Sequence, residues 1–214
     1  MMAVLNFGEI SDKLKRGDEI SLKSRTQRYL ELSRVCGEYR MIGFYPKIES
    51  PDGDDVTSQR FQALEQYIQS MWNDAFWSYI HGSFPACILL AASALEGALK
   101  YRLFEVIGDE RAISKYLTLD KCIKRSMNEN ILPNDKKHRI VRAASRVQKM
   151  RDGLIHANRE RWQPEIVLFG TPREHEVTGS PDMRFIREYK TGARMGLIHT
   201  GRVLGHLFPQ SRPY

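Results

Sequence analysis

The sequence lacks the cysteine patterns of a disulfide-rich or zinc-binding protein. Its 214 residues include three cysteines, Cys36, Cys87 and Cys122, which lie far apart and form neither a CxxC pair nor a cluster with histidine. An odd number of scattered cysteines fits reduced thiols in the cytoplasm and argues against a structural zinc site. We therefore expect a cytoplasmic protein that uses neither a metal nor another cofactor.

Other signatures are also missing. The chain does not start with a basic segment followed by a long apolar run, so no signal peptide is predicted. The most apolar stretch, residues 84–99, is shorter than a membrane span requires, so we expect no membrane partner. The sequence has no GxxxxGK[ST], GxGxxG, GxSxG or HExxH motif, which removes the strongest signals for nucleotide binding and hydrolysis. With 42% hydrophobic residues, the chain can still bury a core.

What the sequence does contain is helical periodicity. Apolar residues recur every three or four positions along several consecutive segments, which is typical of amphipathic helices. We expect a helix from Thr57 or Ser58 to the break at 81–83, and then helices over 85–108, 118–130 and 135–158. The second is apolar on nearly all sides and should be central and buried. The predicted fold is all-α, a bundle of four to five helices over 56–158.

Two extensions should flank this bundle. Residues 1–55 form an N-terminal extension and linker, with a helix-friendly composition over 19–40 and a segment rich in Pro, Gly and acidic residues before the bundle.

Residues 159–214 form a C-terminal extension. The segments 164–172 and 183–190 have strand-like patterns and predict a small β-hairpin. The segment 193–207 predicts one more helix, although its three glycines lower the helix propensity.

Positive charge is concentrated near one predicted helix. From residue 136 to 162 there are nine Lys or Arg against two acidic residues, an excess as large as the +7 of the entire chain. Such a concentration is typical of a surface that contacts a nucleic-acid backbone. The candidate backbone contacts are Arg142, Arg146, Lys149 and Arg159. The alternative is an ordinary solvated helix face.

Arg151 and His156 are the candidate catalytic residues. Arg151 falls on the apolar stripe of its helix, where a permanently charged guanidinium needs a carboxylate, a phosphate or water. His156 follows five residues later and is suited to proton transfer near neutral pH. Five residues on an ideal helix turn through about 140°, so the two side chains should point to different sides of the helix. The length of Arg151, a last turn loosened by Gly153, or a dimer cleft approached from two helix edges would each bring them to a common site.

The string VQKMRDGLIHAN at 147–158 resembles the signature of the HEPN superfamily, in which an Arg, a polar residue and a His lie on the last core helix of a bundle. The segments AASALEGALKYRL at 91–103 and TLDKCIKRSMNENILP at 118–133 are similar to the preceding helices of that family. The resemblance covers about half of the chain. It implies a homodimer whose motif helices meet at the interface. Many members are metal-independent endoribonucleases, and others only bind.

For this chain the resemblance implies an endoribonuclease that cuts RNA by attack of its own 2′-OH. His156 would move the proton and Arg151 would hold the phosphate, giving a 2′,3′-cyclic phosphate and a 5′-OH. Asp152 and Glu96 would support these two residues. Such enzymes serve as toxins or as effectors of antiviral defence, so an antitoxin or a regulatory protein is an expected partner besides RNA.

Each residue also has a structural alternative. Arg151 would then pair with a buried acid and hold the bundle together, and Glu96 is either that acid or the partner of Lys100 four residues on. Asp152 either orients its neighbours or is solvated, and His156 is then a cation at a helix C-terminus. At the level of function, the alternatives are a non-catalytic HEPN-type module that binds nucleic acid, a nucleotide or a protein, and a helical scaffold without a ligand.

Overall fold

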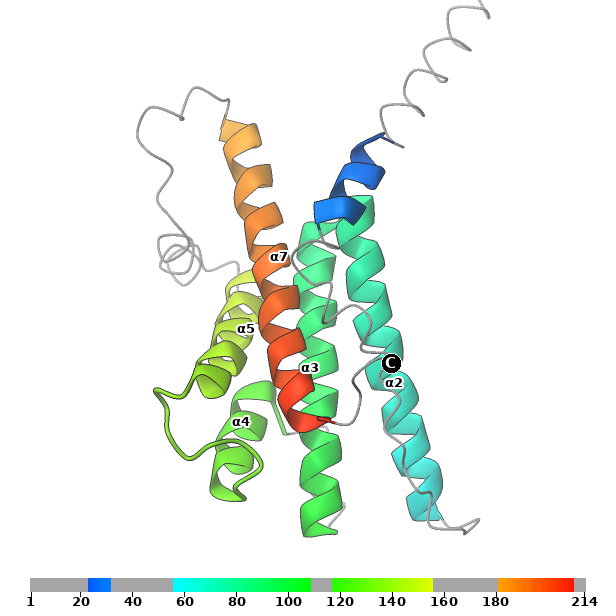
Figure 1. Ribbon diagram of the computed structural model, residues 1–214, viewed down its shortest axis with the longest axis vertical. Coiled ribbons are helices and arrows are strands. Elements are labelled where there is room, and N and C mark those ends of the chain that lie inside the picture. Colours follow the sequence, from blue (N-terminus) through cyan, green and yellow to red (C-terminus); the bar gives the residue numbers. More distant parts are fainter. Residues whose placement is uncertain (1–22, 32–55, 109–116, 156–180, 210–214) are drawn as a thin grey trace, which may run out of the picture.

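The computed structural model describes residues 23–31, 56–108, 117–155 and 181–209, and every regular element in these ranges is an α-helix (Figure 1). The all-α class is therefore confirmed for the described part of the chain. A short helix covers 23–31. The other helices are α2 (Val56–His81), α3 (Phe84–Ile107), α4 (Leu119–Asn128), α5 (Arg139–Ile155) and α7 (Pro181–Leu207).

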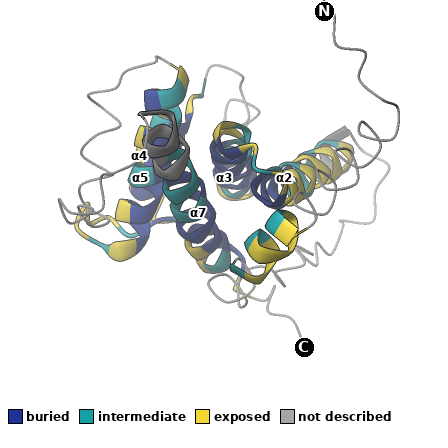
Figure 2. Ribbon diagram, turned by 90° about the horizontal axis from the view of Figure 1, so that it is seen from above, coloured by how far each residue is buried: buried dark blue, intermediate teal, exposed yellow. Residues whose placement is uncertain are grey.

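Helix α3 is the centre of the molecule, and α2, α4, α5 and α7 all pack against it (Figures 1 and 2). Because α3 is apolar on nearly every side, it becomes stable only when neighbours cover all of that surface. Its fully buried residues include Ile88, Leu95, Leu99 and Leu103. The expectation of a central, buried second helix is confirmed.

The same helix meets the length and hydropathy criteria for a membrane span, and it is the one helix among the described residues that does so. The apolar stretch expected from the sequence covered 84–99 and was too short to span a membrane, whereas the helix itself continues to Ile107. Most of its apolar window is covered by the rest of the bundle, as is usual for a core helix.

Glycine residues end α2 and α3 where the sequence predicts breaks. Gly82 has a positive φ of 83°, and its N–H and that of Ser83 bond back to the carbonyls of Tyr79 and Ser78 at 3.0 and 2.8 Å. These two bonds form a Schellman motif, which satisfies the last carbonyls of α2. Gly108, with φ of 67°, closes α3 by bonding to Phe104.

Helix α5 begins at Arg139, four residues after the expected start at Asp135. The carboxylate of Asp135 accepts the N–H of Lys137 at 2.8 Å, which stabilises a local turn in place of helix. The ring of His138 then accepts the N–H of Ile140 at 3.3 Å and satisfies a donor in the first turn of the helix.

The strand predicted over 183–190 is wrong, because this segment is the first part of α7. The hairpin that would pair it with 164–172 is therefore also wrong, and 164–172 lies outside the described residues. A segment of eight residues in which apolar and charged side chains are mixed fits both a strand and a helix period. The longer pattern that starts at Pro181, a residue compatible with a first helical turn, decides for helix.

Helix α7 packs along α3 and α5, and its buried residues, such as Leu197 and Leu204, belong to the same hydrophobic core as the other helices. The helix expected at 193–207 is therefore confirmed, but it starts earlier. Although we expected a C-terminal extension after residue 158, α7 is an integral part of the bundle.

The helix expected from the composition of 19–40 is confirmed for its described part, residues 23–31 (Figure 1). This helix contacts the bundle through charged groups. Glu31 accepts hydrogen bonds from the hydroxyl of Tyr79 at 3.3 Å and from Nζ of Lys190 at 3.0 Å. One carboxylate thus joins three helices that are distant in the sequence.

Two helical glycines provide a test of the packing. A Cβ on Gly97 would lie 2.9 Å from Ile68 Cγ1, whereas a Cβ on Gly196 would lie 3.9 Å from Ile88 Cγ1. We expect Gly97→Ala to destabilise the protein by about 1–3 kcal/mol, because α2 must move away. Gly196→Ala should stabilise it by up to about 1 kcal/mol through helix propensity. Urea denaturation measures both, and equal effects of the two substitutions would contradict the close α2–α3 contact.

Candidate functional site

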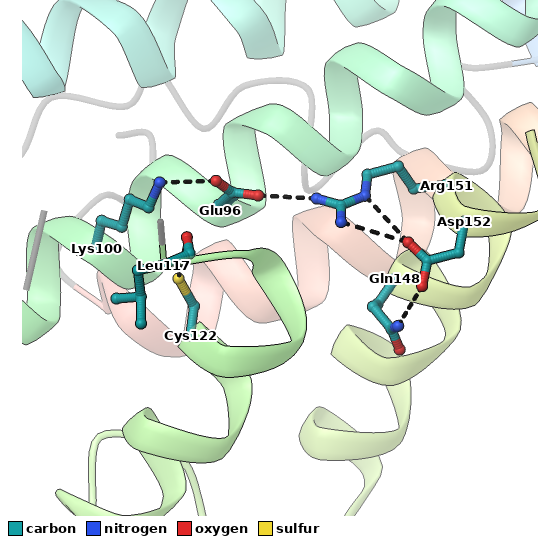
Figure 3. A network of polar contacts seen from close by, with 7 residues as sticks. All are labelled: Glu96, Lys100, Leu117, Cys122, Gln148, Arg151 and Asp152. Carbon is teal, nitrogen blue, oxygen red and sulfur yellow. Dashed lines mark hydrogen bonds and ion pairs between the residues drawn. The ribbon is translucent and has the colours of Figure 1, made fainter. Parts of the chain in front are cut away.

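Arg151 lies in the last turns of α5 and points toward α3, where Glu96 meets it (Figure 3). Nη1 of Arg151 donates to Oε2 of Glu96 at 2.8 Å, and Nζ of Lys100 donates to Oε1 at 2.7 Å. The Glu96 carboxylate therefore binds one cation with each oxygen. The two alternatives that the sequence left open for Glu96 are both true, because it is the partner of Lys100 and also of Arg151.

Asp152 holds the other side of the guanidinium. Its Oδ1 lies 3.4 Å from Nε and 3.3 Å from Nη2 of Arg151. Its Oδ2 accepts a hydrogen bond of 2.5 Å from the amide of Gln148, one turn earlier on α5. With a carboxylate on each side, the plane of the Arg151 guanidinium is fixed relative to α3.

This polar cluster, defined by Glu96, Lys100, Gln148, Arg151 and Asp152, is partly buried. The charged side chains that form it are between 13% and 23% exposed. Two cations face two carboxylates, so the cluster is neutral in total. Partial burial strengthens each ion pair relative to a fully solvated one, because water screens the charges less.

The thiol of Cys122 on α4 lies beside this cluster (Figure 3) and is buried. Burial, and to a smaller extent the Glu96 carboxylate, raises the pKa of Cys122 to about 12, although the nearby cations Lys100 and Arg151 act in the opposite direction. Its Sγ lies 3.6 Å from the carbonyl of Leu117. A thiol that stays protonated is not a nucleophile, so the chemistry of this cluster rests on its charged groups.

The structure brings together Arg151, Asp152 and Glu96, three of the residues that the sequence analysis selected. His156 and Arg159 lie outside the described residues. Described α5 ends at Ile155, so the arrangement of His156 relative to Arg151 stays a prediction.

The basic residues of α5 lie on another side of the helix. Arg142 and Lys149 are exposed and Arg146 is half-buried. Arg151 follows Arg142 by nine residues and Lys149 by two, which on an ideal helix means a rotation of about 180° and 160°, respectively. Within the described part of one chain, the structure therefore does not combine Arg151 with the backbone candidates Arg142 and Lys149 of α5.

Sequence reasoning missed Gln148 and Cys122. Gln148 precedes Asp152 by four residues, and this spacing is a signal for a side-chain pair on a helix. Cys122 carries no such signal, since only the packing of α4 against α3 and α5 places its thiol near Glu96. Within the described ranges, no group of three or more His, Cys, Asp or Glu residues is arranged to hold a metal ion.

Comparisons with protein-family models, with curated proteins and with solved structures found no match to this chain. The resemblance to the HEPN superfamily therefore depends on the sequence motif and the segments quoted in the sequence analysis alone.

A double-mutant cycle tests the ion pair between α3 and α5. Glu96→Gln leaves two neighbouring cations without their carboxylate, and we expect it to cost about 1–3 kcal/mol of unfolding free energy. In the Arg151→Ala background the loss should be smaller, because the main partner is gone. Glu105→Gln is the matched control on α3: its pair with Arg102 is more exposed, so the cost should stay below about 0.5 kcal/mol. Additive effects of Glu96 and Arg151 in chemical denaturation would contradict the coupling.

His199 on α7 is 1% exposed and lies near Arg146 and Arg202. Burial, together with the nearby guanidinium groups of Arg146 and Arg202, lowers the pKa of His199 to about 4. The imidazole is therefore neutral near pH 7 and packs as a core residue.

The His199 environment predicts a loss of stability in acid. Between pH of about 6.5 and 4 the unfolded chain binds a proton at this residue and the folded chain does not, so stability falls as the pH falls through that window. The contribution should be about 3 kcal/mol at its full extent. Denaturation at pH 7 and pH 4.5 should show a smaller acid loss for His199→Asn than for the natural protein. The exposed His81→Asn should behave like the natural protein, and parallel pH curves for all three would contradict the assignment.

Proposed function

We propose that this protein is a metal-independent endoribonuclease of HEPN type that acts as a homodimer in the cytoplasm. The observation that supports the proposal is the placement of Arg151. Its guanidinium is fixed by carboxylates from α3 and α5, yet the side chain remains 19% exposed, which leaves a path for a ligand to approach. The helical bundle with a basic motif helix packed on a central apolar helix is compatible with the HEPN resemblance.

In this proposal Arg151 binds the phosphate that is cut. A guanidinium presents five N–H donors, and the described contacts with Glu96 and Asp152 use three of its nitrogens while donors remain on Nη1 and Nη2. A phosphate oxygen can bind these remaining donors, which places the positive charge where charge grows in the transition state. Glu96 and Asp152 are then positioning residues, because they act through the orientation of Arg151.

The proposed reaction needs a proton acceptor for the 2′-OH and a proton donor for the 5′ oxygen. We assign both tasks to His156 residues of the two subunits, because a histidine changes charge near neutral pH. The 2′ oxygen attacks phosphorus, the bond from phosphorus to the 5′ oxygen breaks, and a 2′,3′-cyclic phosphate and a 5′-OH result. Arg142, Arg146, Lys149 and Arg159 would contact the RNA backbone, and a toxin or defence role under an antitoxin or regulatory protein follows from the resemblance.

The alternative is a non-catalytic HEPN-type binding module. One observation favours it: Glu96 and Asp152 already neutralise Arg151 within the chain. The ion pair then connects α3 to α5, and any nucleic acid, nucleotide or protein binds elsewhere.

Cleavage assays distinguish these functions. The natural protein should cut single-stranded RNA in the presence of EDTA, and the products should carry a 2′,3′-cyclic phosphate. His156→Ala and Arg151→Ala should each reduce the rate by at least about 100-fold, because an acid–base group or a charge clamp contributes that much. Arg151→Lys, which keeps the charge but loses the planar fork, should recover part of the rate.

Circular dichroism and size-exclusion chromatography provide the control for these variants, since each should retain the fold and the dimer. Glu105→Gln, which removes an exposed carboxylate of α3 outside the cluster, should cut RNA at the natural rate. Intact RNA after incubation with the natural protein, with or without divalent metal ions, would contradict the enzyme and favour the binding module.

A further inference from the structure

We propose that the outer surface of the α5–α7 pair is a nucleic-acid backbone-binding surface that is separate from Arg151. We call it the cationic seam and define it as Arg139, Arg142, Arg146 and Lys149 of α5 together with Arg202 of α7. It extends beyond the α5 residues assigned above, and binding there does not require RNA cleavage.

The packing of α5 against α7 brings the two sets of cations together (Figure 1). Arg146 and Arg202 both lie close enough to the buried His199 to act on its charge, one from each helix. Arg139 of α5 likewise lies close enough to His206 of α7 to act on the charge of that imidazole. Arg139, Arg142, Lys149 and Arg202 are exposed and Arg146 is half-buried.

This surface has very little negative charge. Along α5, residues 139–155, there are five Lys or Arg and one acidic residue, and the stretch of α7 around Arg202, residues 191–208, contains no acidic residue. The acid of α5 is Asp152, which binds Arg151 and Gln148 in the polar cluster. By contrast, the basic residue Lys124 of α4 pairs with Asp120 at 2.7 Å. An exposed excess of positive charge attracts a polyanion.

The seam also lacks what a protein partner usually requires. Protein interfaces have an apolar centre with a few large anchoring side chains. In the described part of the chain, the exposed large hydrophobic residues lie on the helix at 23–31, on α2 and on α3, apart from Ile155 at the end of α5. A charged surface without apolar anchors fits a phosphodiester backbone better than an acidic protein.

The spacing of the cations suits a repeating anion. Arg139 and Lys149 are ten residues apart, which corresponds to about 15 Å along a helix axis. The intervals of three and four residues between the α5 cations correspond to about 4.5–6 Å, and arginine binds phosphate oxygens with two parallel N–H donors. The row thus presents a cation to each of several successive phosphates.

The salt dependence of binding tests the seam directly. We would measure fluorescence anisotropy of labelled single-stranded 2′-O-methyl RNA, which cannot be cut through its 2′ position, with the full chain at several KCl concentrations. Arg139→Gln, Arg142→Gln and Arg202→Gln should each weaken binding and reduce the slope of log K against log[KCl] by about 0.7. Lys124→Gln, the matched control, should change neither quantity. All four are exposed, and circular dichroism verifies their folds.

Two further probes identify the ligand. If the seam binds the phosphodiester backbone in general, single-stranded DNA of the same sequence should show the same reduction in the slope of log K against log[KCl] in the seam variants. If only RNA binds, the ligand is RNA. Both results support the seam. Unchanged slopes in the three variants overturn the proposal. Binding of a poly-glutamate peptide that depends on these residues, in the absence of RNA binding, also overturns it. Seam-dependent binding without cleavage of ordinary RNA would retain the seam and reject the nuclease.

Discussion

The burial of α3 is the constraint on which the rest of the structure depends. A helix of 24 residues that is apolar on nearly all sides must be covered from every direction, and α2, α4, α5 and α7 do so. Its few charged positions must then find either solvent or a partner between the covering helices. Glu96 and Lys100 lie one turn apart on α3, and Glu96 meets Arg151 of α5. The polar cluster is thus a consequence of how the core closes.

Helix α5 separates two kinds of electrostatic environment. On the side toward α3, cations and carboxylates are matched, and partial burial keeps them in fixed geometry. On the outer side and along the later part of α7, residues 191–207, cations occur with almost no carboxylates. A matched cluster orients a group, whereas an unmatched surface attracts a ligand from solution. The two sides of one helix therefore serve different physical purposes, and of the two it is the outer side that contributes to the +7 excess of the chain.

Much of the fold follows from the sequence, because the signals are local. The break at Gly82, the cap at Gly108 and the apolar periodicity of α3 each depend on a few neighbouring residues. The error at 183–190 arose because a run of eight residues is compatible with two periods, and packing of the later part of α7 on α3 decides between them. Of the cluster, the Arg151 pairing with an acid could be predicted, since a guanidinium on an apolar face needs a partner. The position of Cys122 could not, because it depends on how α4 packs.

The charge balance of the cluster also bears on how a ribonuclease of this kind would work. A guanidinium attracts a phosphate at 4 Å by about 4 kcal/mol in the environment of a protein surface, and a carboxylate at twice that distance opposes it by about half as much. By this measure Glu96 and Asp152 together offset about as much attraction as Arg151 alone exerts, and the charge of Lys100, which binds Glu96, restores part of it. Stabilising the extra negative charge of a transition state then requires cations that these carboxylates do not neutralise. Among the described residues of α5, such cations lie on the side opposite Arg151. In the proposed chemistry, a second subunit is therefore a direct way to bring cations of that kind to the same phosphate.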